Sequence, residues 1–290
     1  MGKLRDRLVL KLGEVHPKSE LLPWLKGYIP HPDSYIRNSI PIEKRLYYAK
    51  LGYTEFLAEM NIELNFDQAL AIGALISGDY HTGYMIEPPR FGKSFIMGAL
   101  ANYLAMHSYS VSVVASKSSR TAKVMEHARR HLRGASIDMK NMLVEESKAS
   151  ISKADKLLGR SETAYSKSRI VFKNGNKIDT KSTGDTFSSM DSDENIGEGS
   201  HVLIDEMDFI SERALTELGR REFERDDGES LILFGISNPR FLNHFHESVT
   251  NPNLKDDEFV IWGNIVTSME SDSIKMTPEE VLASDFARTE

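Results

Sequence analysis

The chain has 290 residues, of which 40% are apolar and 27% are charged, and it contains no cysteine. This length and composition are typical of a globular protein with a buried core, and they exclude disulfide bonds, thiol catalysis and cysteine-bound zinc. The net charge of −7 is uneven, because residues 117–181 hold 16 basic and 7 acidic side chains whereas residues 182–290 hold 8 and 25. The basic segment is suited to a polyanion, and the alternative is a solvated basic face balanced by an acidic one.

The first sixty-five residues predict an N-terminal extension of helical and irregular structure. Five prolines between residues 17 and 41 prevent one regular element there, so we expect this stretch to wrap a surface. Apolar side chains then recur at three- and four-residue spacing over residues 42–60, which predicts a helix. No apolar run is long enough to cross a membrane, and none follows the charged N-terminus as in a secretory signal.

From residue 67 the sequence alternates helices with short apolar strands. Helices are predicted over residues 67–76, closed by Gly78, and over residues 94–107 and 118–132. Strands are predicted over residues 83–86, 111–115, 201–204, 231–236 and 258–262. A hairpin is predicted over residues 168–180, with Asn174-Gly175 supplying the positive φ angles of a tight turn. The fold class is therefore α/β, with a mostly parallel sheet covered by helices.

The segment between the first of these strands and the following helix is typical of a phosphate-binding loop. It reads Glu87-Pro88-Pro89-Arg90-Phe91-Gly92-Lys93-Ser94, with Glu87 in the place of the usual first glycine. Backbone N–H groups at a helix N-terminus bind polyphosphate, the lysine reaches the β- and γ-phosphates and the hydroxyl binds Mg²⁺. We therefore expect this loop to bind a nucleotide through Pro88, Pro89, Arg90, Phe91, Gly92, Lys93 and Ser94.

Two further strands end in polar residues that suit nucleotide chemistry. Residues 201–204 are followed by Asp205, which can hold Mg²⁺ through water, and by Glu206, which can polarise an attacking water; the alternative is an acidic strand end without a role. Residues 231–236 are followed by Ser237 and Asn238, at the position where P-loop motors sense the γ-phosphate; the alternative is an ordinary strand-to-turn transition.

Gln68 lies nineteen residues before the phosphate loop. Its side-chain amide both donates and accepts hydrogen bonds, so it can read the edge of adenine. The alternative is that Asp67 caps the N-terminus of a helix and Gln68 is simply exposed.

The order of these motifs resembles the ATPase half of the large terminase subunit of tailed bacteriophages. The resemblance rests on Gln68, the loop with Arg90 two residues before Gly92, the strand at residues 111–115, the Asn174-Gly175 hairpin, Asp205-Glu206 and Ser237-Asn238, and it covers residues 60–285. It implies a RecA-like, additional-strand P-loop NTPase fold, which we expect over residues 66–270. It also implies that Arg90, Lys93 and Glu206 are catalytic, that Ser94 and Asp205 hold Mg²⁺, and that Ser237 and Asn238 couple hydrolysis to movement.

The function that the resemblance implies is a Mg²⁺-dependent ATPase that moves double-stranded viral DNA into a procapsid, with ATP and Mg²⁺ as cofactors. Its implied partners are DNA, a portal protein, a small terminase subunit and further copies of the chain in a ring, with a monomer in isolation as the alternative. The implied location is the cytoplasm of the infected bacterial host. Two other functions stay open: a helicase-type DNA-dependent ATPase, and a nucleotide-binding, portal-docking module with little activity alone.

Basic residues after the second predicted strand are candidates for contacts to DNA phosphates, namely Lys117, Lys123, Arg129 and Arg130. The chain departs from the terminase pattern because residues 188–193 lack the arginine that many members carry for a neighbour's nucleotide. The candidates for this trans-acting role are Arg129, Arg130, Arg133 and Arg160. We expect no nuclease activity, and residues 271–290 are expected to form a lid or linker toward a nuclease domain that this chain lacks.

Overall fold

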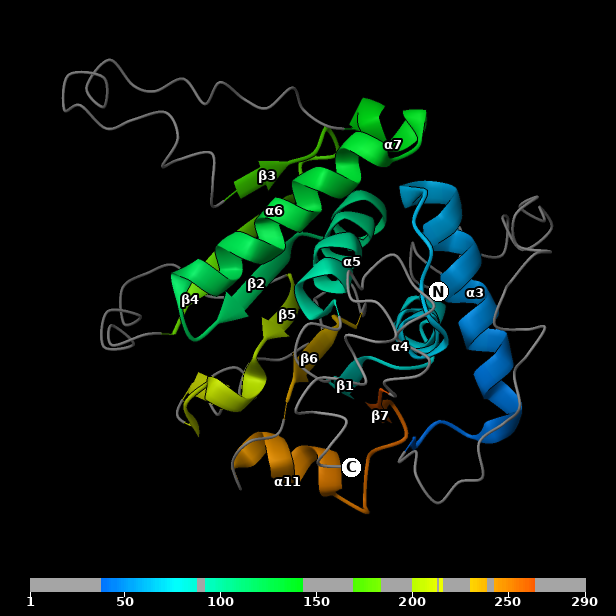
Figure 1. Ribbon diagram of the computed structural model, residues 1–290, viewed down its shortest axis with the longest axis vertical. Coiled ribbons are helices and arrows are strands. Elements are labelled where there is room, and N and C mark those ends of the chain that lie inside the picture. The colour runs from blue at the N-terminus through cyan, green and yellow to red at the C-terminus, as the bar shows by residue number, and fades with distance from the viewer. Residues whose placement is uncertain are drawn as a thin grey trace, which may run out of the picture.

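The computed structural model describes residues 38–87, 92–142, 169–183, 200–212, 214–215, 230–238 and 243–263. Pro88, Pro89, Arg90, Phe91, Arg160 and the expected linker at residues 271–290 lie outside them. The described residues build a seven-stranded sheet with helices on both faces (Figure 1). The predicted α/β class with a mostly parallel sheet is therefore confirmed.

The strands are β1 (Thr82–Ile86), β2 (Val111–Ala115), β3 (Arg169–Val171), β4 (Lys177–Ser182), β5 (His201–Asp205), β6 (Leu233–Ser237) and β7 (Glu258–Trp262). Their order across the sheet is β3-β4-β2-β5-β6-β1-β7, and each neighbouring pair is parallel except β3 and β4. Strands β2, β5 and β6 are buried along their whole length, as expected for strands covered by helices on both faces.

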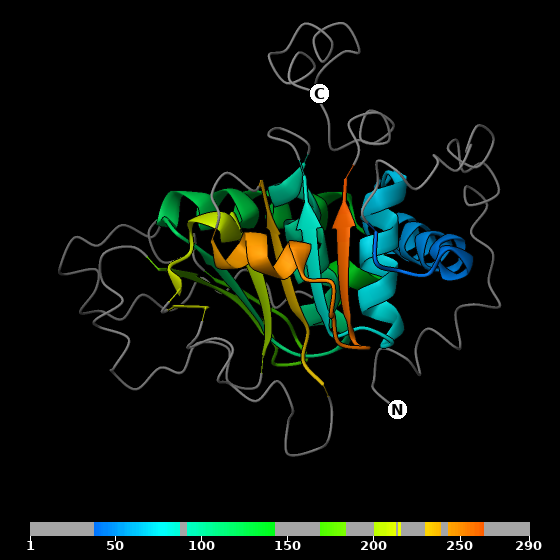
Figure 2. The same ribbon diagram turned by 90° about the horizontal axis from the view of Figure 1, so that it is seen from below.

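Three helices pack against one face of the sheet: α4 (Phe66–Ser77), α5 (Lys93–His107) and α6 (Ser118–Gly134). Helix α3 (Ile42–Met60) packs on these helices, and α7 (Ile137–Met142) packs on α6. The short helix α11 (His244–Thr250) covers the opposite face, together with the 3₁₀ helix η3 (Met207–Phe209) (Figure 2). The helix predicted over residues 42–60 is confirmed at both ends. None of the helices in the described residues has the length and apolarity needed to cross a membrane.

Helix α3 belongs to the main hydrophobic core, although it precedes the boundary expected at residue 65. Its buried side chains Tyr48 and Phe56 join the cluster that also contains residues of α4 and α5. Two glycines bring α3 and α4 into backbone contact, since a Cβ on Gly73 would lie 1.8 Å from the carbonyl oxygen of Tyr48 and one on Gly52 would lie 2.1 Å from that of Ala69. The close approach of these helices therefore depends on residues without side chains.

Helix α6 is fixed on α5, the helix that follows the phosphate loop. A Cβ on Gly98 would lie 2.7 Å from the amide nitrogen of Ala128, and the Asn102 Nδ2 donates to the Ala128 carbonyl at 2.8 Å. The His131 ring lies with its Nε2 3.0 Å from the Phe95 carbonyl, and burial lowers the pKa of His131 to about 4. His131 is thus neutral near pH 7 and donates this bond through Nε2–H. These contacts hold the second half of α6 against α5.

The predicted hairpin forms from β3 and β4, but its turn differs from the prediction. Only Gly175 has a positive φ, of 86°, whereas Asn174 does not. The Gly175 N–H donates to the Phe172 carbonyl, and the Phe172 N–H donates to the Asn176 carbonyl, as in a turn followed by a glycine bulge. The Asn174 amide instead donates to the carbonyls of Ala105 and Met106, so its role is to fasten the turn to the end of α5.

Candidate active site at the carboxyl edge of the sheet

The carboxyl ends of β1, β5 and β6 meet at one edge of the sheet. The register pairs Ile86 with Ser237 and Asp205 with Ile236, so all three strands end at the same level. Strand β6 lies between β1 and β5. The residues that follow β1 and β6, and those that end β5, are therefore brought together, and they are the ones predicted from sequence.

Lys93 is the first residue of α5 and points back across this edge. The preceding Gly92 has a φ of 81°, a left-handed conformation that glycine adopts without strain. The Lys93 Nζ donates to the Glu87 carbonyl at 3.0 Å and to the Asn238 Oδ1 at 2.6 Å. The structure thus brings Lys93 into contact with the side-chain amide of Asn238, directly after β6. The sequence predicted that both residues contact the same nucleotide, which requires them to lie close together.

Ser94 and Asp205 are also in direct contact. The Ser94 hydroxyl donates to the Asp205 Oδ2 at 2.9 Å, while the Asp205 Oδ1 is buried without a hydrogen-bond partner among the described residues. Burial raises the pKa of Asp205, opposed by the bond from Ser94. A hydroxyl beside an unsatisfied carboxylate oxygen fits Mg²⁺, which takes oxygen ligands and binds through one or two carboxylates plus substrate phosphates. No group of three or more His, Cys, Asp or Glu side chains is placed for a metal within the described ranges.

Glu206 has an unusual backbone and an ion pair that sequence reasoning missed. Its φ of 54° and ψ of 51° place it in the left-handed region, which costs a non-glycine residue about 1 kcal/mol. Its carboxylate Oε1 lies 2.9 Å from the Nη1 of Arg120, in the first turn of α6. The available sequence signal was a basic residue in the first turn of the helix after β2, since that turn also starts at the carboxyl edge.

Asp208 links the end of β5 to the end of β6 and to α11. Its N–H donates to the Ser237 hydroxyl at 3.1 Å, and the Ser237 carbonyl accepts from the Glu87 N–H at 3.1 Å. The Asn243 Nδ2 donates to the Asp208 carbonyl at 2.7 Å and to its Oδ1 at 3.0 Å, while the Asn243 Oδ1 caps α11. Ser237 therefore bridges Glu87, which follows β1, and η3, and Asn243 extends this connection to α11 on the other face of the sheet.

Gln68 is fully buried in the first turn of α4. The helix is capped by Asn65, whose side chain accepts from the Gln68 N–H at 2.8 Å, and the Gln68 Oε1 accepts from the Asn65 N–H at 3.3 Å. The alternative of an N-cap at Asp67 followed by an exposed Gln68 is therefore wrong in both parts. A contact from Gln68 to adenine stays a prediction, and the structure gives this side chain a role in forming the helix.

Glu87 places a buried carboxyl group directly after the end of β1. The residue is 1% exposed, and neither side-chain oxygen has a hydrogen-bond partner among the described residues. Burial raises the pKa of Glu87 well above its usual value, and Asp67 raises it further, whereas Lys93 lowers it. The side chain packs against Gly263, where a Cβ would lie 2.8 Å from the Glu87 Cδ. The residue in the place of the usual first glycine is thus a buried carboxyl group whose pKa is raised.

The predicted DNA-contact residues do not form one surface. Lys117 and Lys123 are exposed, and the Arg130 Nη2 pairs with the Glu126 Oε1 one turn back at 2.9 Å. Arg129 faces another way, since its Nη2 donates to the Arg169 carbonyl of β3 at 3.5 Å. Arg133 is exposed near the end of α6.

Comparisons with known proteins give no family. No protein-family model and no curated protein matches the chain. Among solved structures, the Phi-28 gp11 DNA packaging motor is similar with a TM-score of 0.34 and 12% identity, over 73% of this chain and 61% of that chain. The chain thus spans about three fifths of the length of that protein. A similarity this weak carries no argument about fold family or activity.

Proposed function

We propose that the chain is a Mg²⁺-dependent P-loop ATPase that drives double-stranded DNA into a viral procapsid, as the ATPase part of a large terminase subunit. The observation that carries the ATPase proposal is the pair of contacts Ser94–Asp205 and Lys93–Asn238, which unites three strand ends at one edge. The placement of β6 between β1 and β5 supports an additional-strand, RecA-like core.

The phosphates of ATP bind at the N-terminus of α5. There the helix presents backbone N–H groups and the positive end of its dipole, and Lys93 adds a full charge. The Lys93 Nζ exchanges one of its present acceptors, the Glu87 carbonyl or Asn238 Oδ1, for a phosphate oxygen. Asn238 then lies beside the γ-phosphate, where its amide senses the presence of that group, and Arg90 adds charge from the loop.

Ser94 and Asp205 hold the metal ion. The Ser94 hydroxyl oxygen and the Asp205 Oδ1, which is buried without a hydrogen-bond partner among the described residues, would be the protein ligands of Mg²⁺. A metal ion held by these residues would supply positive charge against the phosphates.

Glu206 orients the attacking water. Its carboxylate lies next in the chain to Asp205, at the end of β5, and is held by Arg120 through one oxygen, Oε1. A carboxylate paired with a guanidinium is a weaker hydrogen-bond acceptor for water. Full activity therefore requires Glu206 to loosen this ion pair when the nucleotide is bound.

The DNA-packaging part of the proposal rests on the order of sequence motifs and on the basic segment. Eleven Lys and Arg face three Asp and Glu over residues 117–142 and 169–183, which favours binding to the phosphates of DNA. We place the protein in the cytoplasm of the infected host, as a ring of copies with a portal protein and a small terminase subunit as partners.

Two substitutions test the site. Lys93→Ala removes the positive charge at the helix start, and we expect loss of ATP binding and turnover. Glu206→Gln keeps the shape and removes the charge that orients water, so ATP should still bind while turnover falls by about 10²- to 10⁴-fold. Nucleotide affinity and phosphate release are measured for both. If the Lys93→Ala variant hydrolysed ATP at the parent rate, the proposed site would be wrong. If the Glu206→Gln variant no longer bound ATP, Glu206 would have a structural role instead.

A further inference from the structure

Among the described residues of the basic segment, two separate groups of cations can be compared. The α6 set consists of the exposed side chains Lys117, Lys123 and Arg130. The edge cluster lies at the β3–β4 end of the sheet and consists of Arg169 and Lys177, which both contact Asp179, and of Arg129, which contacts the Arg169 carbonyl. We infer that the phosphate backbone of double-stranded DNA binds the edge cluster rather than the α6 set. This inference rests on the proposed function for its partner and names the surface that takes it.

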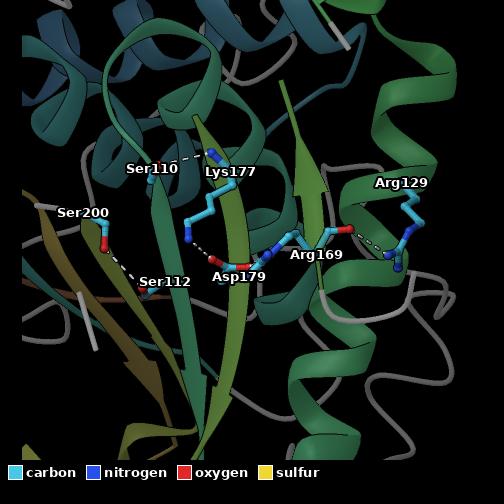
Figure 3. Close-up of polar contacts among 7 residues, drawn as sticks. All are labelled: Ser110, Ser112, Arg129, Arg169, Lys177, Asp179 and Ser200. Atoms are coloured by element: carbon cyan, nitrogen blue, oxygen red, sulfur yellow. Dashed lines mark hydrogen bonds and ion pairs between the residues drawn. The ribbon is translucent and has the colours of Figure 1, made fainter. Parts of the chain in front are cut away.

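The edge cluster forms a continuous row of polar contacts from α6 across β3 to β4 (Figure 3). The Arg129 Nη2 donates to the Arg169 carbonyl at 3.5 Å, and the Arg169 Nε binds the Asp179 Oδ1. The Lys177 Nζ lies 3.1 Å from the Asp179 Oδ2. Two cations thus share the Asp179 carboxylate, and Arg129 joins them through the Arg169 carbonyl. With three cations and one carboxylate, the cluster has two positive charges in excess.

Rigid backbone supports this row. The Lys177 N–H donates to the Ser110 hydroxyl at 3.1 Å, and the Ser112 and Ser200 hydroxyls, 3.1 Å apart, join β2 to the residue before β5 (Figure 3). The Asn176 side chain donates to the carbonyls of Ala105 and Ser108, which fixes the hairpin on the end of α5. Cations that are already ordered lose less conformational entropy when they bind a ligand.

Two cations of the edge cluster, Arg169 and Lys177, are more accessible to a phosphate group than Asp179 is. The side chains of Arg169 and Lys177 are 53% and 47% exposed, whereas Asp179 is 15% exposed. A guanidinium presents its N–H donors in a planar fork that matches phosphate oxygens, so two arginines favour a phosphate ligand. The carboxylate therefore orders the cations while it remains largely covered.

The α6 set is less suited to a polyanion. Glu126, whose side chain is 69% exposed, lies between Lys123 and Arg130 on the same side of the helix and pairs with Arg130. An exposed carboxylate at this place repels phosphate and competes for the arginine. Exposed pairs of this kind also contribute little to stability, so the side chains are not held in one geometry.

The edge cluster is also separate from the nucleotide-binding edge. Ile178 pairs with Val111, the first residue of β2, so Lys177 lies at the amino-terminal edge of the sheet. Asp205 pairs with Ala115, the last residue of β2, at the carboxyl edge. DNA on the edge cluster therefore does not compete with ATP for the residues around Lys93.

The test compares two triple variants that each remove three positive charges. One is Arg129→Gln, Arg169→Gln and Lys177→Gln, and the other is Lys117→Gln, Lys123→Gln and Arg130→Gln. The affinity of each for a mixed-sequence DNA duplex is measured by fluorescence anisotropy at several salt concentrations, after thermal unfolding has shown that both are folded. We expect the edge variant to lose about 10- to 100-fold in affinity and to reduce the slope of log K against log salt by about 2 to 3.

The α6 variant should change that slope by less than about 1. Equal losses in both variants, a larger loss in the α6 variant, or no DNA binding by the parent would each overturn the inference. ATP turnover by the parent without DNA is measured alongside. Absence of turnover counts against the ATPase proposal, whereas the DNA measurements alone decide where the duplex binds.

Discussion

Arg120 makes an ion pair with the candidate catalytic carboxylate Glu206. In the structure the Arg120 Nη1 lies 2.9 Å from the Glu206 Oε1, and both side chains are partly exposed. Such a pair is worth at most about 1 kcal/mol, so its loss should change turnover by no more than about fivefold.

Replacing Arg120 with Gln should therefore raise ATP turnover without DNA by about two- to fivefold, because Glu206 becomes free to accept a hydrogen bond from water. Steady-state phosphate release gives kcat and KM for this variant. Lys140→Gln, which removes an exposed positive charge from α7, is the control for net charge. A fall in kcat at constant KM would show that Arg120 instead positions Glu206 for catalysis.

Glu87 gives the fold a dependence on pH that can be measured. Because burial raises its pKa in the folded state, the folded chain keeps this proton at pH values where the unfolded chain, in which the glutamate has its ordinary pKa of 4.5, has lost it. The stability that Glu87 contributes is therefore complete below pH 4.5 and is lost as the pH rises toward its folded pKa. Each unit of difference between the two pKa values corresponds to about 1.4 kcal/mol.

Glu87→Gln keeps the shape that packs against Gly263 and has no proton to lose. We expect the melting temperature of the variant, relative to the parent, to increase as the pH is raised from about 5 to about 8. Thermal unfolding followed by circular dichroism at several pH values measures this difference. A difference that stays constant with pH would show that Glu87 is ionised in the folded chain.

At the scale of elements, the packing of α3 on α4 depends on Gly73. Gly73→Ala would place a methyl group 1.8 Å from the Tyr48 carbonyl and 3.0 Å from the Gly52 nitrogen, so the two helices must separate. We expect the free energy of unfolding to fall by about 1 to 3 kcal/mol, as for other overpacked cores. Urea denaturation measures the change.

Gly134→Ala is the matched control, because a Cβ there meets only the Met60 carbonyl at 3.7 Å. This substitution should leave the stability within about 0.5 kcal/mol of the parent. If Gly73→Ala were as stable as Gly134→Ala, the contact between α3 and α4 would be looser than the structure describes.

Local sequence patterns predicted the elements well where one signal dominated. Helix α3 and strands β2 and β7 begin and end where apolar spacing placed them. The turn of the hairpin was predicted in place but not in conformation, because Asn174 satisfies carbonyls of α5 rather than a positive φ. A contact to another element decided that geometry, and local preferences do not contain it.

In the candidate site, too, the features that depend on local sequence and strand order could be predicted, and those that depend on contacts between distant elements could not. Asp205 ends β5, Asn238 follows β6 and Lys93 begins the helix after β1. These residues could be placed together because parallel strands share one carboxyl edge. The ion pair of Arg120 with Glu206 and the bonds of Asn243 to Asp208 could not be predicted, since each joins side chains from elements whose relative position only the folded chain defines.

At the scale of the whole molecule, the sheet separates two regions that the proposed function requires. The carboxyl edge gathers Lys93, Ser94 and Asp205, while the β3–β4 end carries the edge cluster. Helix α6 extends between them, with Arg120 in its first turn and Arg129 two to three turns later. A motor that converts ATP hydrolysis into DNA movement needs both surfaces to be connected, and here one continuous sheet connects them.

The most direct measurement of the central claim is ATP turnover by the purified chain, with and without duplex DNA, over a range of protein concentrations. We predict Mg²⁺-dependent turnover that rises when DNA is added, rises per molecule as the protein is concentrated into assemblies, and disappears in Lys93→Ala. Absence of turnover under all of these conditions, or turnover that Lys93→Ala retains, would contradict the account.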